Sequence, residues 1–83
     1  MKVLYFAWLR ERIGVAEETI DLPADIGTIG ALTDFLAARS PRHALAFADR
    51  RSIKTALDQV FVSPDTRLGG AGEVAYFPPF TGG

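Results

Sequence analysis

One segment of the sequence has the period of an amphipathic helix, and strand-like segments lie on both sides of it. Thr28 is a good N-cap residue, and Ile29, Leu32 and Leu36 follow at the helical spacing, with Phe35 widening the apolar stripe. A helix with one apolar stripe must bury it against another element, and the surrounding strands are the partner that the sequence offers. We therefore expect an α+β domain in which a mixed sheet packs on one main helix.

The segment before this helix is typical of two strands. Lys2–Trp8 is rich in aromatic and branched residues, and Glu17–Leu22 alternates polar and apolar residues, as a strand with one wet face does. Between them, Leu9–Ile13 favours a short helical turn closed by Gly14. The short connection predicts an antiparallel hairpin that ends at Pro23.

The segment after the helix predicts a second helix and three further strands. Ser40-Pro41 ends the main helix, and His43–Asp49 favours a shorter one. Lys54–Val62 divides at Asp58-Gln59 into two short strands joined by a tight turn. EVAYFP is the last strand, because the proline pair that follows Phe77 cannot donate hydrogen bonds to a sheet.

Charge and hydropathy exclude several classes of function. Nine basic and ten acidic residues give a net charge of −1, which is no footprint for nucleic acid binding. The run Arg50-Arg51 with Lys54 is short, and we interpret it as a solvated loop. No apolar stretch is long enough to span a bilayer, and the start MKVLYFAWLRER alternates like a strand instead of resembling a signal peptide. We expect a cytoplasmic protein that binds neither nucleic acid nor membranes.

The sequence offers no set of residues for self-contained catalysis. Cysteine is absent, which removes disulfides and thiolate nucleophiles, and a single histidine, His43, provides neither a zinc site nor a catalytic triad. We expect His43 at the surface or half-buried, and Glu17, Glu18 and Asp58 in solvent or in turns without a base or metal partner. The glycines of Leu68–Gly72 precede a strand instead of a helix, so we interpret them as a connection and not as a phosphate loop.

The sequence ends in FPPFTGG, whose residue types suit a defined task. Pro78 and Pro79 hold the chain extended and keep Phe77 in the β or polyproline region. From Pro78 to Gly83 the tail can reach about 20 Å. We therefore divide the chain into a domain of residues 1–77 and an extended Gly-Gly tail of residues 78–83. A stiff base, a thin end and a free carboxylate are suited to entering a narrow channel in another protein.

A resemblance to a known family spans the whole chain. It rests on four segments in order: KVLYFAWLRE, the helix that Thr28 begins, ALDQVFVS and EVAYFPPFTGG. The chain resembles the small subunits of molybdopterin synthase, which are ubiquitin-like sulfur carriers with the β-grasp fold. It departs from that family where Asp58 replaces the usual Asn and where Gly70-Ala71-Gly72 replaces an acidic Asp-Gly-Asp run. Both departures concern local turn geometry and lie outside the tail.

The resemblance implies a chemistry for the tail. An E1-like activating enzyme would use ATP to adenylate the carboxylate of Gly83, and sulfur from another protein would displace AMP to leave a thiocarboxylate. Gly82 keeps the end of the tail thin. The tail would enter the large subunit of a heterotetrameric synthase, which transfers the sulfur to a cyclic pyranopterin precursor in molybdenum cofactor biosynthesis. The chain itself would be a non-catalytic, sulfur-donating subunit with no bound cofactor or metal.

The last strand and the ubiquitin-like fold together predict a docking face. Val74 and Tyr76 share one side of this strand, while Ala75 and Phe77 share the other. The resemblance sends Val74 and Tyr76 toward the helix and Phe77 outward.

Two further phenylalanines match outward positions of neighbouring strands, so we expect an apolar patch of the kind that marks an interface. Arg10 is expected to add a charge contact at its rim. The expected partner interface consists of Phe6, Phe61, Phe77, Pro78, Pro79, Phe80 and Thr81.

Alternative functions stay open on the sequence alone. Another ubiquitin-like sulfur carrier or protein modifier, such as the thiamine-pathway carrier or a conjugating protein, would share the fold and the terminal Gly-Gly. A noncovalent binding module would share the docking face, and its tail would be incidental. The proline pair and the length of the chain favour the molybdopterin synthase subunits.

Overall fold

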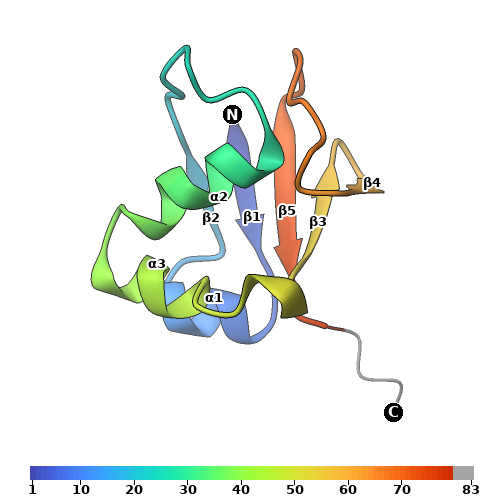
Figure 1. Cartoon of the computed structure of the whole chain (residues 1–83). Coiled ribbons are helices and arrows are strands. Elements are labelled where there is room, and N and C mark those ends of the chain that lie inside the picture. Colours follow the sequence, from blue (N-terminus) through green and yellow to red (C-terminus); the bar gives the residue numbers. More distant parts are fainter. Residues whose placement is uncertain (80–83) are drawn as a thin grey trace.

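The computed structural model describes residues 1–79 and shows a five-stranded sheet with helices against one face (Figure 1). The strands are β1 (Lys2–Tyr5), β2 (Glu17–Thr19), β3 (Lys54–Leu57), β4 (Val60–Val62) and β5 (Glu73–Phe77). The helices are α1 (Trp8–Ile13), α2 (Ile29–Ala37) and α3 (Pro41–Ala46), followed by the 3-10 turn η1 (Arg50–Ser52). The α+β class expected from the sequence is confirmed.

The sheet is mixed, and its last strand lies at its centre. The strand order is β2-β1-β5-β3-β4. β5 pairs in parallel with β1, where Tyr5 is opposite Tyr76, and antiparallel with β3, where Lys54 is opposite Phe77. The outer strands β2 and β4 add antiparallel pairs at the two edges. The end of β5 at Phe77 therefore lies beside the end of β1 and the start of β3.

The predicted N-terminal hairpin is present, but both of its strands are shorter than expected. β1 ends at Tyr5 instead of Trp8, because Ala7 adopts a φ of 53° and turns the chain into α1. A positive φ combined with a ψ of −130° is costly for a residue with a β-carbon. β2 ends at Thr19 instead of Leu22. The helical turn before Gly14 forms as predicted, with Gly14 at a φ of 98°.

The main helix begins as predicted, whereas the second helix is displaced along the sequence. The Thr28 side chain accepts a hydrogen bond from the backbone N–H of Ala31 at 3.2 Å, which is the expected N-cap. The second helix, α3, starts at Pro41 and ends at Ala46. Pro41 begins this helix, since the first helical position needs no N–H donor and Ser40 caps it, whereas α2 has already ended at Ala37.

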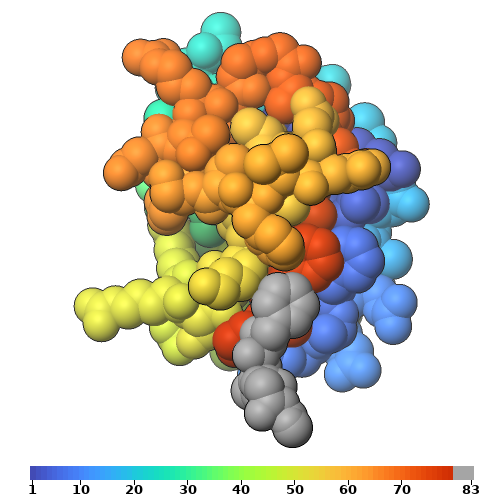
Figure 2. Space-filling view, turned by 90° about the vertical axis from the view of Figure 1, so that its right-hand side faces the viewer, coloured from blue at the N-terminus to red at the C-terminus, as the bar shows by residue number. Residues whose placement is uncertain are grey.

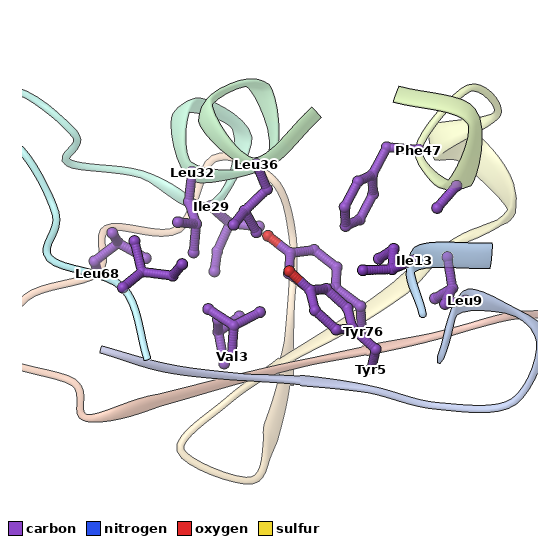
Figure 3. Packing of buried hydrophobic residues seen from close by; sticks show 13 residues of the cluster. Val3, Tyr5, Leu9, Ile13, Ile29, Leu32, Leu36, Phe47, Leu68 and Tyr76 are labelled. Carbon is purple, nitrogen blue, oxygen red and sulfur yellow. The ribbon is translucent and has the colours of Figure 1, made fainter. Parts of the chain in front are cut away.

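The core lies between the sheet and the helices and is built around two stacked tyrosines. The rings of Tyr5 and Tyr76 have centroids 6.3 Å apart, and Phe47 meets Tyr76 edge-on at 4.9 Å (Figure 3). The Tyr76 hydroxyl donates to the Thr33 hydroxyl at 2.9 Å, because the proton of Thr33 is donated to a backbone carbonyl. The aliphatic side chains around these rings are Val3, Leu9, Ile13, Ile29, Leu32, Leu36, Leu68 and Val74.

The tight turn predicted at Asp58-Gln59 joins β3 to β4, and both of its residues have positive φ, 46° and 72°. The Asp58 carboxylate accepts hydrogen bonds from the backbone N–H groups of Gly72 and Glu73, at 3.2 and 3.0 Å. The two departures from the family pattern are thus in contact. The turn holds the glycine-rich connection, which leads into β5 and not into a helix, as expected.

Candidate docking site

The outer face of the sheet, opposite the helices, carries the three phenylalanines singled out in the sequence. Strand alternation places Val74 and Tyr76 in the core, where both are fully buried, and turns Phe77 outward. Phe6 follows β1 and is 40% exposed, and Phe61 lies on β4 and is 59% exposed. The predicted orientation of all these residues agrees with the structure.

The three phenylalanine rings lie together. The rings of Phe6 and Phe77 stack with centroids 4.5 Å apart and an interplanar angle of 4°. The Phe61 ring lies 5.6 Å from that of Phe77 on the other side. Figure 2 shows the end of β5, in red, between the β3–β4 hairpin and the N-terminal segment, in blue. Phe77 is therefore the centre of the cluster.

The cluster borders a shallow hollow of about 380 Å³. Its floor is made of small residues, because Ala56 and Ala75 are directly opposite each other on β3 and β5. Both alanines are nearly buried, while Leu4 next to them is half-buried. We call the group Leu4, Phe6, Ala56, Phe61, Ala75 and Phe77 the outer apolar face. The floor residues Leu4 and Ala56 were missed in the sequence, although the alternation of KVLY and KTAL places them on this side.

The tail leaves the domain at one corner of the outer apolar face. Phe77 is the last residue of β5, and the backbone N–H of Phe6 donates to the carbonyl of Tyr76 at 3.1 Å, which ties the neighbouring segment to this corner. Pro78 is half-buried and Pro79 is exposed. The other predicted tail residues, Phe80, Thr81, Gly82 and Gly83, lie outside the described residues.

A group of polar residues on the helix side corrects two expectations. His43 is buried, not half-exposed, because its ring packs beside Tyr5. Glu18 is not a solvent-facing carboxylate without partners, since its Oε2 lies 2.7 Å from His43 Nε2 and accepts a hydrogen bond from the Tyr5 hydroxyl at 2.7 Å. Ser40 Oγ lies 2.7 Å from His43 Nδ1. These four residues are the Glu18 network.

The Glu18 network holds elements of the fold together. It joins the edge strand β2 to the start of α3 and lies on the face of the sheet away from Phe77. Partial burial opposes the ionisation of Glu18, but the hydrogen bonds from His43 and Tyr5 and the charge of Arg39 outweigh it and lower its pKa from the ordinary 4.5. Burial and the hydrogen bond to Glu18 raise the pKa of Tyr5, so its hydroxyl remains a donor.

Two further observations on the described residues concern metal ions and membranes. Among residues 1–79, no group of three or more histidine, aspartate or glutamate side chains is placed to hold a metal ion. No helix within the same range is long and apolar enough to cross a membrane. The outer apolar face is a contiguous apolar patch next to the exit of the chain, and exposed patches of this kind often mark interaction surfaces.

Fold and site together define a class, the ubiquitin-like β-grasp domain with an apolar sheet face beside its C-terminal tail. The chain belongs to the ThiS family, which it matches over residues 3–83. It is 43% identical to the molybdopterin synthase sulfur carrier subunit of Escherichia coli strain K12 and 35% identical to that of Haemophilus influenzae. Both alignments cover 100% of this chain and 99% of the relative.

Solved structures agree with this assignment. SAMP1 from Haloferax volcanii superposes with a TM-score of 0.77 at 25% identity, covering 100% of this chain and 98% of that one. The resemblance that the sequence suggested is thereby confirmed, and so is the β-grasp fold.

Proposed function

We propose that the chain is the sulfur carrier subunit of a molybdopterin synthase and that it carries sulfur as a thiocarboxylate on Gly83. The observation that carries this proposal is the full-length match to two relatives bearing that name, in a chain whose last residues are FPPFTGG. The outer apolar face supports it, because the face borders the point where the tail leaves β5. The chain lacks cysteine, so a thiol cannot be its sulfur carrier.

The chemistry of the proposal follows from the poor reactivity of a carboxylate. One oxygen of the Gly83 carboxylate attacks the α-phosphate of ATP, pyrophosphate leaves, and the acyl-adenylate gains a good leaving group. A sulfide equivalent from a donor protein then displaces AMP and leaves the thiocarboxylate. ATP is used by the activating enzyme, and the chain itself holds no cofactor.

The partners follow from the same proposal. An E1-like adenylyltransferase binds the chain to activate it, and the synthase large subunit receives the loaded tail and transfers its sulfur to a cyclic pyranopterin precursor. The outer apolar face is the shared docking surface, with Pro78 and Pro79 guiding the tail. Two expectations stay predictions from the sequence: the protein is cytoplasmic, and it binds neither nucleic acid nor membranes.

A second candidate function is protein modification, which the likeness to the small archaeal modifier protein 1 of Haloferax volcanii favours. The activation step is the same in both candidates, but the acceptor differs. A modifier would form amide bonds with lysine side chains of other proteins, whereas a sulfur carrier would give up its sulfur and return as the free carboxylate. Incubation with the activating enzyme, the large subunit and the pterin precursor separates the two by their products.

The decisive test concerns the position of the carboxylate. One alanine appended after Gly83 moves the carboxylate away from the catalytic groups, and a misplacement of about 1 Å can cost on the order of a hundredfold in rate. We expect that the chain with the added alanine is not loaded with sulfur, while it still folds and docks. Intact mass spectrometry after incubation with the activating enzyme, ATP and a sulfur donor measures the replacement of one oxygen by sulfur.

The control is Gly82→Ala, which widens the tail without moving its end and should slow loading less severely. Normal loading of the extended chain, or sulfur on any group other than Gly83, contradicts the proposal.

Docking is tested separately through Phe77. Its ring is the centre of the aromatic cluster, so we expect Phe77→Ala to weaken binding to the large subunit by about 2 kcal/mol or more. Val15→Ala is a matched control, because Val15 is an exposed apolar residue outside the outer apolar face. Titration calorimetry measures both affinities, and an unchanged affinity of the Phe77 variant refutes the proposed interface.

A further inference from the structure

The end of the sheet at which the tail leaves is lined with exposed cations. Lys54 begins β3 directly opposite Phe77, so it lies on the outer side of the sheet beside the last residue of β5. Arg51 precedes it in η1 and is also exposed. The run that we interpreted as a solvated loop is therefore next to the exit of the tail.

A second group of cations lies on the other side of the same exit. Phe6 stacks on Phe77, and α1 starts two residues after Phe6 with Arg10 and Arg12 exposed on it. In Figure 2 the yellow segment around η1 and the blue segment after β1 lie on either side of the red end of β5. Arg10, predicted as a rim residue, is thus one part of a larger arrangement.

Several of these charges are not neutralised within the domain. Among the described residues, Arg10, Arg51 and Lys54 take part in no ion pair. Arg50, in contrast, pairs with Asp34, and Arg12 lies over the Trp8 ring.

The opposite end of the sheet carries carboxylates as well as the cations Lys2 and Arg67. β5 begins there at Glu73, next to the Asp58 turn, and the loop after β2 adds Asp21 and Asp25. The chain has a net charge of −1, so the cations at the tail end do not reflect a generally basic protein.

We propose that Arg10, Arg51 and Lys54 form a basic collar around the exit of the tail, and that this collar docks on a carboxylate-rich rim at the entrance of the protein channel that receives the tail. The inference rests on the proposed function, and it adds the charge of the partner surface. The occupant is a protein surface and not the reacting anions, because residues 78–83 can reach about 20 Å, and a tail of that length would carry the Gly83 carboxylate beyond the collar.

The collar acts mainly on the rate of association. Exposed rim charges steer a partner toward the correct orientation and raise the association rate constant by about tenfold or more at low salt. The effect is screened when the ionic strength shortens the Debye length to about 3 Å near 1 M salt. The outer apolar face sets the dissociation rate, because its contacts form only after docking.

The test is the association kinetics of the full chain with the synthase large subunit, measured by stopped flow at low and high salt. We expect the double variant Arg51→Glu, Lys54→Glu to associate about tenfold more slowly at low salt, with a dissociation rate within about twofold of wild type. Arg51→Gln, Lys54→Gln should give an intermediate rate. At high salt the rates of all the variants should converge on that of the wild type.

The matched control is Lys2→Glu, Arg67→Glu, which changes the charge equally at exposed positions away from the tail. Lys2 is opposite Glu73 at the far end of β5, and the backbone of Arg67 forms an isolated antiparallel β-bridge with that of Thr28. This control should associate like the wild type, and thermal melts should show that every variant is folded.

The collar is overturned, while the proposed function stands, if the Arg51→Glu, Lys54→Glu variant and the Lys2→Glu, Arg67→Glu control are slowed equally. It is also overturned if neither of them is slowed. Binding of the wild type to a short single-stranded DNA at physiological salt overturns it as well, because the collar would then serve nucleic acid. Failure of the wild-type chain to bind the large subunit overturns the proposed function, and the collar with it.

Discussion

Glu18 shows how much a single residue can depend on neighbours that are distant in the sequence. Its carboxylate accepts hydrogen bonds from Tyr5 and from the ring of His43, and Arg39 lies 3.5 Å from its other oxygen. Hydrogen bonds to the charged form lower the pKa of a carboxyl group, and the pKa of Glu18 is lowered accordingly. The ionised carboxylate is therefore the form that fits the fold.

This gives a prediction for the pH dependence of stability. A lowered pKa in the folded state stabilises the fold above the ordinary pKa of 4.5, and this contribution is lost as the pH falls through the folded-state value. We expect Glu18→Gln to be less stable than the wild type at neutral pH, with a difference that shrinks below about pH 4.5. Urea unfolding at several pH values measures the difference in free energy of unfolding. A difference that stays constant with pH would contradict this role for the ionised carboxylate.

The Glu18 network could not be predicted from the sequence. Glu18 and His43 are 25 positions apart, and no local motif connects them. They meet because α3, which begins at Pro41 and packs against α1 and α2, places the His43 ring beside the Glu18 carboxylate. Residue roles that follow from strand alternation, such as those of Val74 and Phe77, could be predicted, since alternation is a local property.

The β3–β4 hairpin is the element in which one substitution tests both departures from the family pattern. Asp58 has a positive φ and accepts two hydrogen bonds from the glycine-rich connection. We expect Asp58→Ala to lower the free energy of unfolding by about 1–3 kcal/mol, because alanine tolerates this φ poorly and cannot accept the hydrogen bonds.

Asp58→Asn provides the control for this element. Asparagine also adopts positive φ and keeps one oxygen to accept the hydrogen bonds, so its effect should be a few tenths of a kcal/mol. Thermal and urea unfolding compare the two variants. Equal stability of the alanine variant and the wild type would show that the hairpin does not need this anchor.

At the scale of elements, the sequence predicted the types of structure better than their boundaries. The period of α2 and its Thr28 cap were local signals, and both were correct. The predicted end of β1 was wrong, because an alanine in the sequence gives no sign of the φ of 53° that Ala7 adopts. That conformation occurs where the chain turns from β1 into α1, and it departs from the local propensity of alanine.

For the whole molecule, the proposed division between domain and tail predicts which changes affect stability. Deletion of Gly82 and Gly83 should leave the melting temperature nearly unchanged, since terminal residues contribute little packing. Leu32→Ala should lower stability by about 2–4 kcal/mol, because Leu32 is fully buried in the core. Calorimetry compares the two variants with the wild type. A large decrease for the tail deletion would make the tail part of the folded domain.

The docking site combines features that the sequence could and could not disclose. Three phenylalanines on one face follow from strand alternation once the fold is assumed. The proposed collar does not follow from the sequence, because Arg10 and Lys54 are far apart in it and reach the same end of the sheet only through the register of β1, β5 and β3. The cations Arg50, Arg51 and Lys54 were correctly predicted to be exposed. Their position beside Phe77 could not be predicted, because it depends on how β3 pairs with β5.

The central place of β5 has a consequence for how the protein is made. β1 and β3 do not pair with each other, and both depend on a strand that the ribosome synthesises after every other one. The sheet therefore cannot close while residues 73–77 are still inside the exit tunnel. The complete sheet forms only after this last strand has been synthesised, whereas the pairs β1–β2 and β3–β4 need no residue of β5.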